Sequence, residues 1–169
     1  MAAQTSYNFF TTRGIAGGLY DLSDHVIDAR RNEEDTGVLG FGLGVVVGTN
    51  AGIDVKLPGG SEENATTFEG VTVNGFTTEQ NRAGDVLLVE GATVGVLSHG
   101  RIWVQVVDNG LDIAYGDNVY LVVAGDDKGK FTSDSRGGVR IGGARFLGVP
   151  GSGNTNVVEF HTVGTAAVV

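Results

Sequence analysis

The residue types most often used in catalysis and metal binding are sparse here. The three histidines are His25, His99 and His161, and the chain has no cysteine. None of the histidines has a second histidine or a carboxylate at the spacing of a metal site. The residue types of a nucleophilic triad are present in Ser98, His99 and Asp108. Adjacent residues on one turn cannot adopt triad geometry, however. We therefore expect no metal site and no serine-hydrolase chemistry.

Two glycine-rich stretches and two acidic pairs could also bind ligands. Residues 125–130 leave three residues between the first and second glycine, where a phosphate loop needs four. Residues 40–44 have the wrong spacing for a dinucleotide fingerprint and open an apolar run. The acidic pairs at 62–63 and 126–127 lack the ligand spacing of a calcium loop, which leaves at most a weak surface cation site. The sequence thus predicts no cofactor and no enzymatic activity.

The charge balance excludes further classes of partner. The chain carries 20 acidic and 11 basic residues, and its formal net charge is −9. Binding to nucleic acid and to anionic membranes depends on clustered cations, so neither is expected. No apolar stretch reaches the 18 residues of a membrane-spanning helix.

The elements that position these residues are predicted to be strands. Valine outnumbers leucine by 25 to 11, and 29 of the 169 residues are glycine. β-Branched side chains favour strands, and turn signals recur about every 8–12 residues, as in sandwiches and barrels. We predict an all-β fold, a β-barrel or β-sandwich (jelly-roll-like) body of roughly eight to ten short strands. The predicted strands span residues 41–47, 53–57, 68–73, 85–90, 92–97, 101–107, 118–124, 131–132, 140–149 and 156–163.

Two turns and one strand carry specific expectations. Residues 98–100 are predicted to turn the chain, and residues 125–129 to form a hairpin turn. In the strand at 101–107, Ile102, Val104 and Val106 share one face, and Trp103 lies on the other.

The sequence divides into an extended N-terminal arm, residues 1–36, and a body, residues 37–169. Within the arm, residues 21–31 fit both a helix and a strand, and we favour an extended conformation. The arm carries Phe9 and Phe10, which would be costly to leave in water. Either the arm packs back on its own body, or it docks on another subunit.

The order of segments resembles the structural cement, or capsid decoration, proteins of tailed bacteriophages. The resemblance covers about residues 15–160. The matching segments are 29–34 (ARRNEE), 41–42 (FG), 45–49 (VVVGT), 55–58 (VKLP), 68–73 (FEGVTV), 84–85 (GD), 100–106 (GRIWVQV), 116–120 (GDNVY), 146–148 (FLG) and 157–159 (VVE). The chain departs from the family pattern at Gly40, where proline is common, and at Glu69, where the family has leucine.

The resemblance implies a structural protein that binds the outer surface of the expanded phage head after synthesis in the host bacterial cytoplasm. Its implied partners are the major capsid protein and further copies of itself, with a trimer favoured over a dimer. On this basis we expect the arm to contact the capsid or another subunit, and four charged residues to pair across subunits. The candidate contact residues are Phe9, Phe10, Arg13, Leu19, Tyr20, Arg30, Arg31, Glu33 and Glu34.

Two other functions compete with this interpretation. A carbohydrate-binding β-sandwich, or receptor-binding head domain of a phage, could use Trp103, Tyr115 and Tyr120 as stacking faces. Trp103 lies in the middle of a predicted strand, however, where core or interface packing is the commoner use. A trimeric β-fold enzyme of small-molecule metabolism would need an acid–base or metal set that the sequence does not offer.

Overall fold

The computed structural model describes residues 14–59, 67–75, 88–107, 112–136, 138–151 and 154–161. Within these residues the secondary structure consists of nine strands, which confirms the all-β prediction. They are β1 (Val26–Asn32), β2 (Gly44–Val47), β3 (Asp54–Lys56), β4 (Phe68–Thr72), β5 (Thr93–Gln105), β6 (Tyr115–Leu121), β7 (Phe131–Thr132), β8 (Val139–Pro150) and β9 (Thr155–Phe160). The same residues contain no helix long and apolar enough to cross a membrane.

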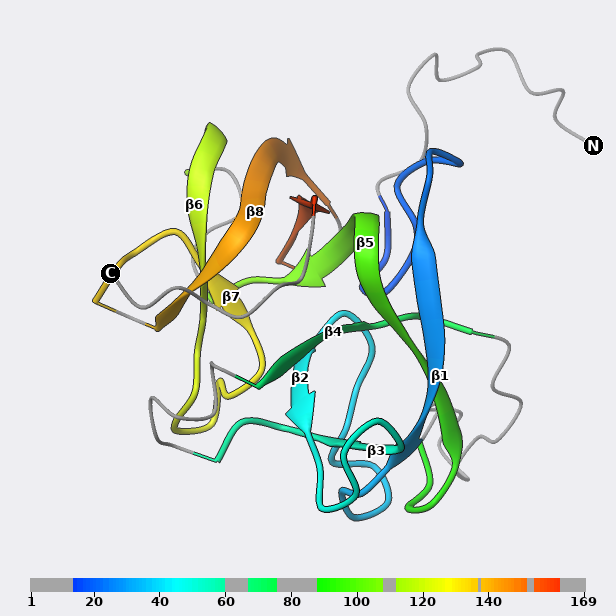
Figure 1. Cartoon of the computed structure of the whole chain (residues 1–169). Helices are drawn as coiled ribbons and strands as arrows, with labels where there is room; N and C mark the ends of the chain where they lie inside the picture. Colours follow the sequence, from blue (N-terminus) through cyan, green and yellow to red (C-terminus); the bar gives the residue numbers. More distant parts are fainter. Residues whose placement is uncertain are drawn as a thin grey trace, which may run out of the picture.

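The strands close into two rings that share β5 (Figure 1). In the first barrel, the pairing runs β1–β3–β2–β4–β5 and returns from β5 to β1. In the second barrel, it runs β5–β9–β8–β6–β7, and a bridge between Val106 and Phe131 joins β7 to the chain just beyond β5. Closing both rings leaves fewer unpaired strand edges than an open sheet would have.

Each barrel has its own hydrophobic core, and β2 contributes to both. Val45 belongs to the core of the first barrel, whereas its neighbour Val46 belongs to that of the second. Successive side chains of a strand point to opposite faces, so β2 lies between the two cores. The larger core is centred on the second barrel and contains Phe131, Phe146 and Phe160.

The expected turn at residues 98–100 is wrong, because the chain continues through it as part of β5. Val94 and Val96 of β5 face the first core, whereas Ile102 and Val104 face the second. Gly100 lies between these pairs with φ of 120°, a backbone conformation that side-chain-bearing residues rarely adopt. β5 therefore bends here and passes from one barrel into the other.

Most other predicted strands are found, with shifted ends. The hairpin turn at 125–129 is confirmed by hydrogen bonds from Gly129 N to Val122 O, at 2.8 Å, and from Val122 N to Lys130 O, at 2.9 Å. The predicted strand at 85–90 is not found at residues 88–90, where Leu88 is buried but outside any strand; residues 85–87 lie outside the described residues.

The sequence assigns β1 to the arm, and the extended conformation favoured for residues 21–31 is confirmed from Val26 onward. β1 pairs with β5 from Val26 to Arg31, and with β3 at Arg31 and Asn32. It is one of the five strands of the first barrel.

Candidate interaction surface

Residues 14–20 lie along β5 almost as an additional strand. The backbone N–H of Gly17 donates to Trp103 O at 2.7 Å, and that of Trp103 donates to Gly18 O at 2.9 Å. Tyr20 N donates to Arg101 O at 3.0 Å, and Leu19 forms an antiparallel bridge with Ile102. These bonds anchor the segment at the junction of the two barrels.

Trp103, the one tryptophan of the chain, is the side chain on which this segment packs. Its indole is buried, and Tyr20 meets it edge-on with ring centroids 5.8 Å apart. A Cβ added at Gly14 or at Gly151 would overlap the ring. The indole is thus held in close contact with two glycines, and residues 14–20 leave it unavailable as a stacking face for a sugar.

The structure describes only some of the contact residues that the sequence predicts in the arm. Leu19 is partly buried against the larger core, and Tyr20 is exposed. Phe9, Phe10 and Arg13 lie outside the described residues.

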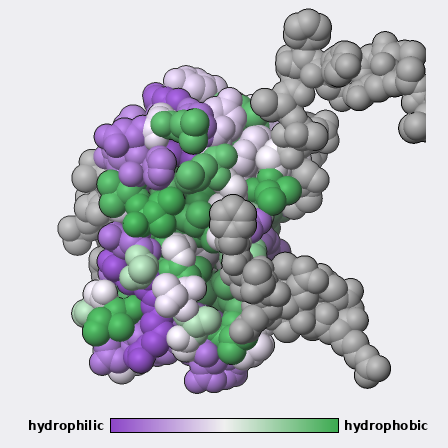
Figure 2. Space-filling model, turned by 90° about the vertical axis from the view of Figure 1, so that its right-hand side faces the viewer, coloured by the Kyte–Doolittle hydropathy of each residue, from purple (hydrophilic) through white to green (hydrophobic). Residues whose placement is uncertain are grey.

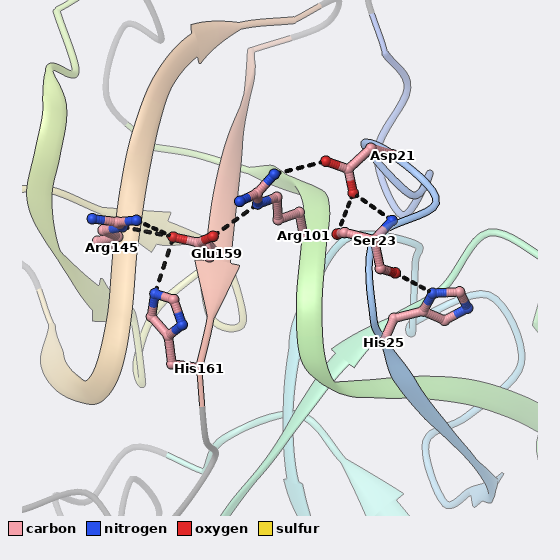
Figure 3. A network of polar contacts seen from close by, with 7 residues as sticks. All are labelled: Asp21, Ser23, His25, Arg101, Arg145, Glu159 and His161. Carbon is pink, nitrogen blue, oxygen red and sulfur yellow. Dashed lines mark hydrogen bonds and ion pairs between the residues drawn. The ribbon is translucent and has the colours of Figure 1, made fainter.

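A polar network beside this segment ties it to the second barrel (Figure 3). Glu159 of β9 is buried and accepts hydrogen bonds from Arg101 at 2.8 Å and from Arg145 at 2.6 Å. Its carboxylate also lies 3.0 Å from His161 Nε2. Arg101 donates a second bond, of 2.8 Å, to Asp21, directly after the anchored segment. The network therefore joins Asp21, β5, β8 and β9.

Glu159 stays ionised because its partners outweigh its burial. Burial raises the pKa of the Glu159 carboxyl. Hydrogen bonds from Arg101 and Arg145 and the charge of His161 lower this pKa by more than burial raises it, so the net pKa is below the ordinary value. A carboxylate already occupied by two guanidinium groups is suited to bracing strands rather than to acid–base work.

Arg30 and Arg31 find their acidic partners within the chain. Arg31 forms a bidentate ion pair with Asp54 of β3, with N–O distances of 2.6 and 2.8 Å. Hydrogen bonds from Arg31 and Asn50 lower the pKa of Asp54 to about 2. Arg30 is held more loosely, 3.4 Å from Glu69 and 3.7 Å from Asp28, and its buried Nε has no hydrogen-bond partner among the described residues.

Glu33 and Glu34 brace neighbouring loops of the first barrel. Glu33 accepts hydrogen bonds from the backbone N–H and the hydroxyl of Thr49, and these lower the pKa of its carboxyl. Glu34 accepts a bond of 2.9 Å from the backbone N–H of Leu57. All four charged residues expected to pair across subunits thus have polar partners in their own chain, and their role between subunits stays a prediction.

Sequence reasoning selected only Tyr20 of an apolar surface that overlaps the anchored segment. Five large apolar side chains are exposed between residues 15 and 27, and we call this stretch the 15–27 apolar segment; they belong to Ile15, Tyr20, Leu22, Val26 and Ile27. Figure 2 shows a hydrophobic band between hydrophilic areas on the side of the molecule where β1 lies. The ambiguous helix or strand pattern of residues 21–31 hid this signal, because it did not show which side chains face outward.

Surface cavities of about 260, 330 and 510 Å³ lie among the described residues. These residues contain no group of three or more histidine or acidic side chains that could hold a metal ion. The cavity of about 260 Å³ lies beside Arg31, Glu33 and Asp54, but these side chains already bond to one another or to their neighbours.

Comparisons with known proteins show the family and a similar fold. A family model described as structural cement protein (E217 gp24/Pam3 gp6) matches residues 3–162. A chain from a structure named "The capsid of Myoviridae Phage XM1" has a similar fold, with a TM-score of 0.70 at 19% sequence identity. The similarity covers 96% of this chain and 99% of that one. No curated protein matches the sequence.

Proposed function

The chain belongs to the phage structural cement protein family, and from this membership we propose that it binds the outer surface of an expanded phage head. There it bridges subunits of the major capsid protein and stabilises the shell against the pressure of packaged DNA. The observation that carries the proposal is the family match over residues 3–162, nearly the whole chain.

The stabilising mechanism that we propose is linkage. A protein that binds only the intact expanded lattice stabilises that lattice in proportion to its occupancy. Several copies joined as an oligomer, with a trimer favoured, gain further affinity because each later contact is intramolecular. If each copy buries on the order of 1,000–2,000 Å² of total surface, even weak contacts repeated over the shell resist the outward pressure of packaged DNA.

The two-barrel body supports this role as a rigid connector. β5 runs through both rings, so a force applied to one barrel passes to the other along a continuous backbone. The hydrogen bonds of residues 14–20 to β5 hold the first described residues against the body. We propose that residues 1–13, with Phe9, Phe10 and Arg13, contact a neighbouring subunit.

The proposal is tested with expanded heads of the parent phage assembled without this protein. The full chain is added, occupancy is measured by co-sedimentation, and the surviving heads are counted after osmotic shock. We expect survival to rise with occupancy, and deletion of residues 1–13 to lower occupancy at least tenfold at equal protein concentration. Saturated heads that break as readily as bare ones would contradict the stabilising role.

A further inference from the structure

The apolar side chains exposed on this protein are concentrated in one short stretch. Five of the nine large exposed apolar side chains in the described part of the chain belong to the 15–27 apolar segment. Leu22 is the most exposed of them, at 94%. Large apolar side chains exposed together in one short segment are typical of a site of contact with another macromolecule.

The acidic charges beside this stretch are only partly neutralised. Asp24 is exposed and forms no ion pair with any residue that the structure describes. Asp28, whose side chain is 46% exposed, forms a loose ion pair with Arg30 at 3.7 Å. The basic neighbour Arg101 is already paired with Asp21 and Glu159 (Figure 3). A partner that fits here has an apolar surface bordered by lysine or arginine.

A second copy placed on the same segment by two-fold symmetry does not fit that description. In such a contact the patch meets itself, so the acidic side chains of both copies would lie in one interface. Charge complementarity therefore favours a different protein.

We propose that the 15–27 apolar segment is the face that lies against the capsid shell, on an apolar surface of the shell protein bordered by basic residues. This inference rests on the function proposed above and specifies its contact face. The face is preformed, since residues 14–20 are hydrogen-bonded to β5 and Val26 and Ile27 belong to β1, and preorganisation lowers the entropy lost on binding.

Single cysteines test which face is covered, because the natural chain has none. Leu22→Cys is compared with Tyr115→Cys, whose parent side chain is 67% exposed on β6 of the second barrel. Maleimide labelling rates are measured free in solution and on expanded heads after co-sedimentation. We expect both variants to label readily in solution, and only Leu22→Cys to slow at least tenfold on the heads.

The outcomes separate this inference from the function on which it rests. Failure of the protein to sediment with heads overturns both. Sedimentation with Leu22→Cys labelled as fast as in solution overturns the contact face alone. Protection of Leu22→Cys in free solution, with disulfide-linked pairs forming on oxidation, shows a second copy on this face and also overturns the inference.

A matched pair of charge changes tests the basic border. Asp24→Lys and Asp126→Lys alter the net charge equally, and Asp126 is exposed in the hairpin turn between β6 and β7. We expect Asp24→Lys to weaken binding to heads about tenfold at low salt and Asp126→Lys to change it less than twofold. Equal effects of the two variants would mean that only total charge matters and would contradict a local basic partner.

Discussion

The carboxylate of Asp54 is buried against Arg31 and Asn50, and it connects β1 to β3 within the first barrel. Its importance is not visible in the sequence, because its main partner lies 23 residues away. The same holds for Glu159, whose partner Arg101 is 58 residues distant. Sequence reasoning selected Arg31 as a candidate contact residue, but it could not foresee that the chain supplies the partner itself.

The low pKa of Asp54 predicts a dependence of stability on pH. The hydrogen bonds from Arg31 and Asn50 lower that pKa from 3.8 to about 2 in the folded state. Because the folded value is below the unfolded one, the stabilisation is complete above about pH 4 and is lost as the pH falls towards 2. We expect the melting temperature to fall in this range and to fall less steeply in Asp54→Asn. Parallel curves for the two proteins would show that Asp54 does not contribute.

At the scale of elements, the strands were predictable and the continuity of β5 was not. Alternation placed Ile102, Val104 and Val106 on one face, and all three lie in the larger core. The Ser-His-Gly sequence at 98–100 indicated a turn because glycine and serine favour turns. In the structure, pairing continues on both sides of it, from Leu97 with Ile27 and from Gly100 with Phe160, so Gly100 bends the strand without ending it.

The docking of residues 14–20 on β5 gives a prediction for Gly14. A methyl group at Gly14 would overlap the indole of Trp103, which has little room to move because Gly151 packs closely against another part of the ring. We expect Gly14→Ala to displace the segment and to shift the tryptophan emission to longer wavelength as water reaches the ring. Trp103 is the only tryptophan, so the signal is unambiguous.

Gly75→Ala is the control for this measurement. A Cβ at Gly75 meets nothing within 4 Å among the described atoms, and its φ is not in the left-handed region. Its emission should match that of the natural protein. An unshifted spectrum for Gly14→Ala would show that the segment does not depend on this contact.

At the scale of the whole molecule, composition indicated an acidic all-β protein, and the ordered segments indicated the cement family. The family and the fold are both confirmed. The closure of two barrels on one shared strand could not be read from the sequence, because it depends on pairings such as β1 with β5 that join residues more than 60 positions apart. The 15–27 apolar segment became visible only when burial was known.

A reconstruction by electron cryomicroscopy of expanded heads with and without the bound chain tests the central claim most directly. The account predicts additional density on the outer surface of the shell, into which both barrels fit, touching more than one capsid subunit and oriented with the 15–27 apolar segment towards the shell. Density that contacts a single capsid subunit, that lies inside the shell, or that is absent at saturating protein would contradict it.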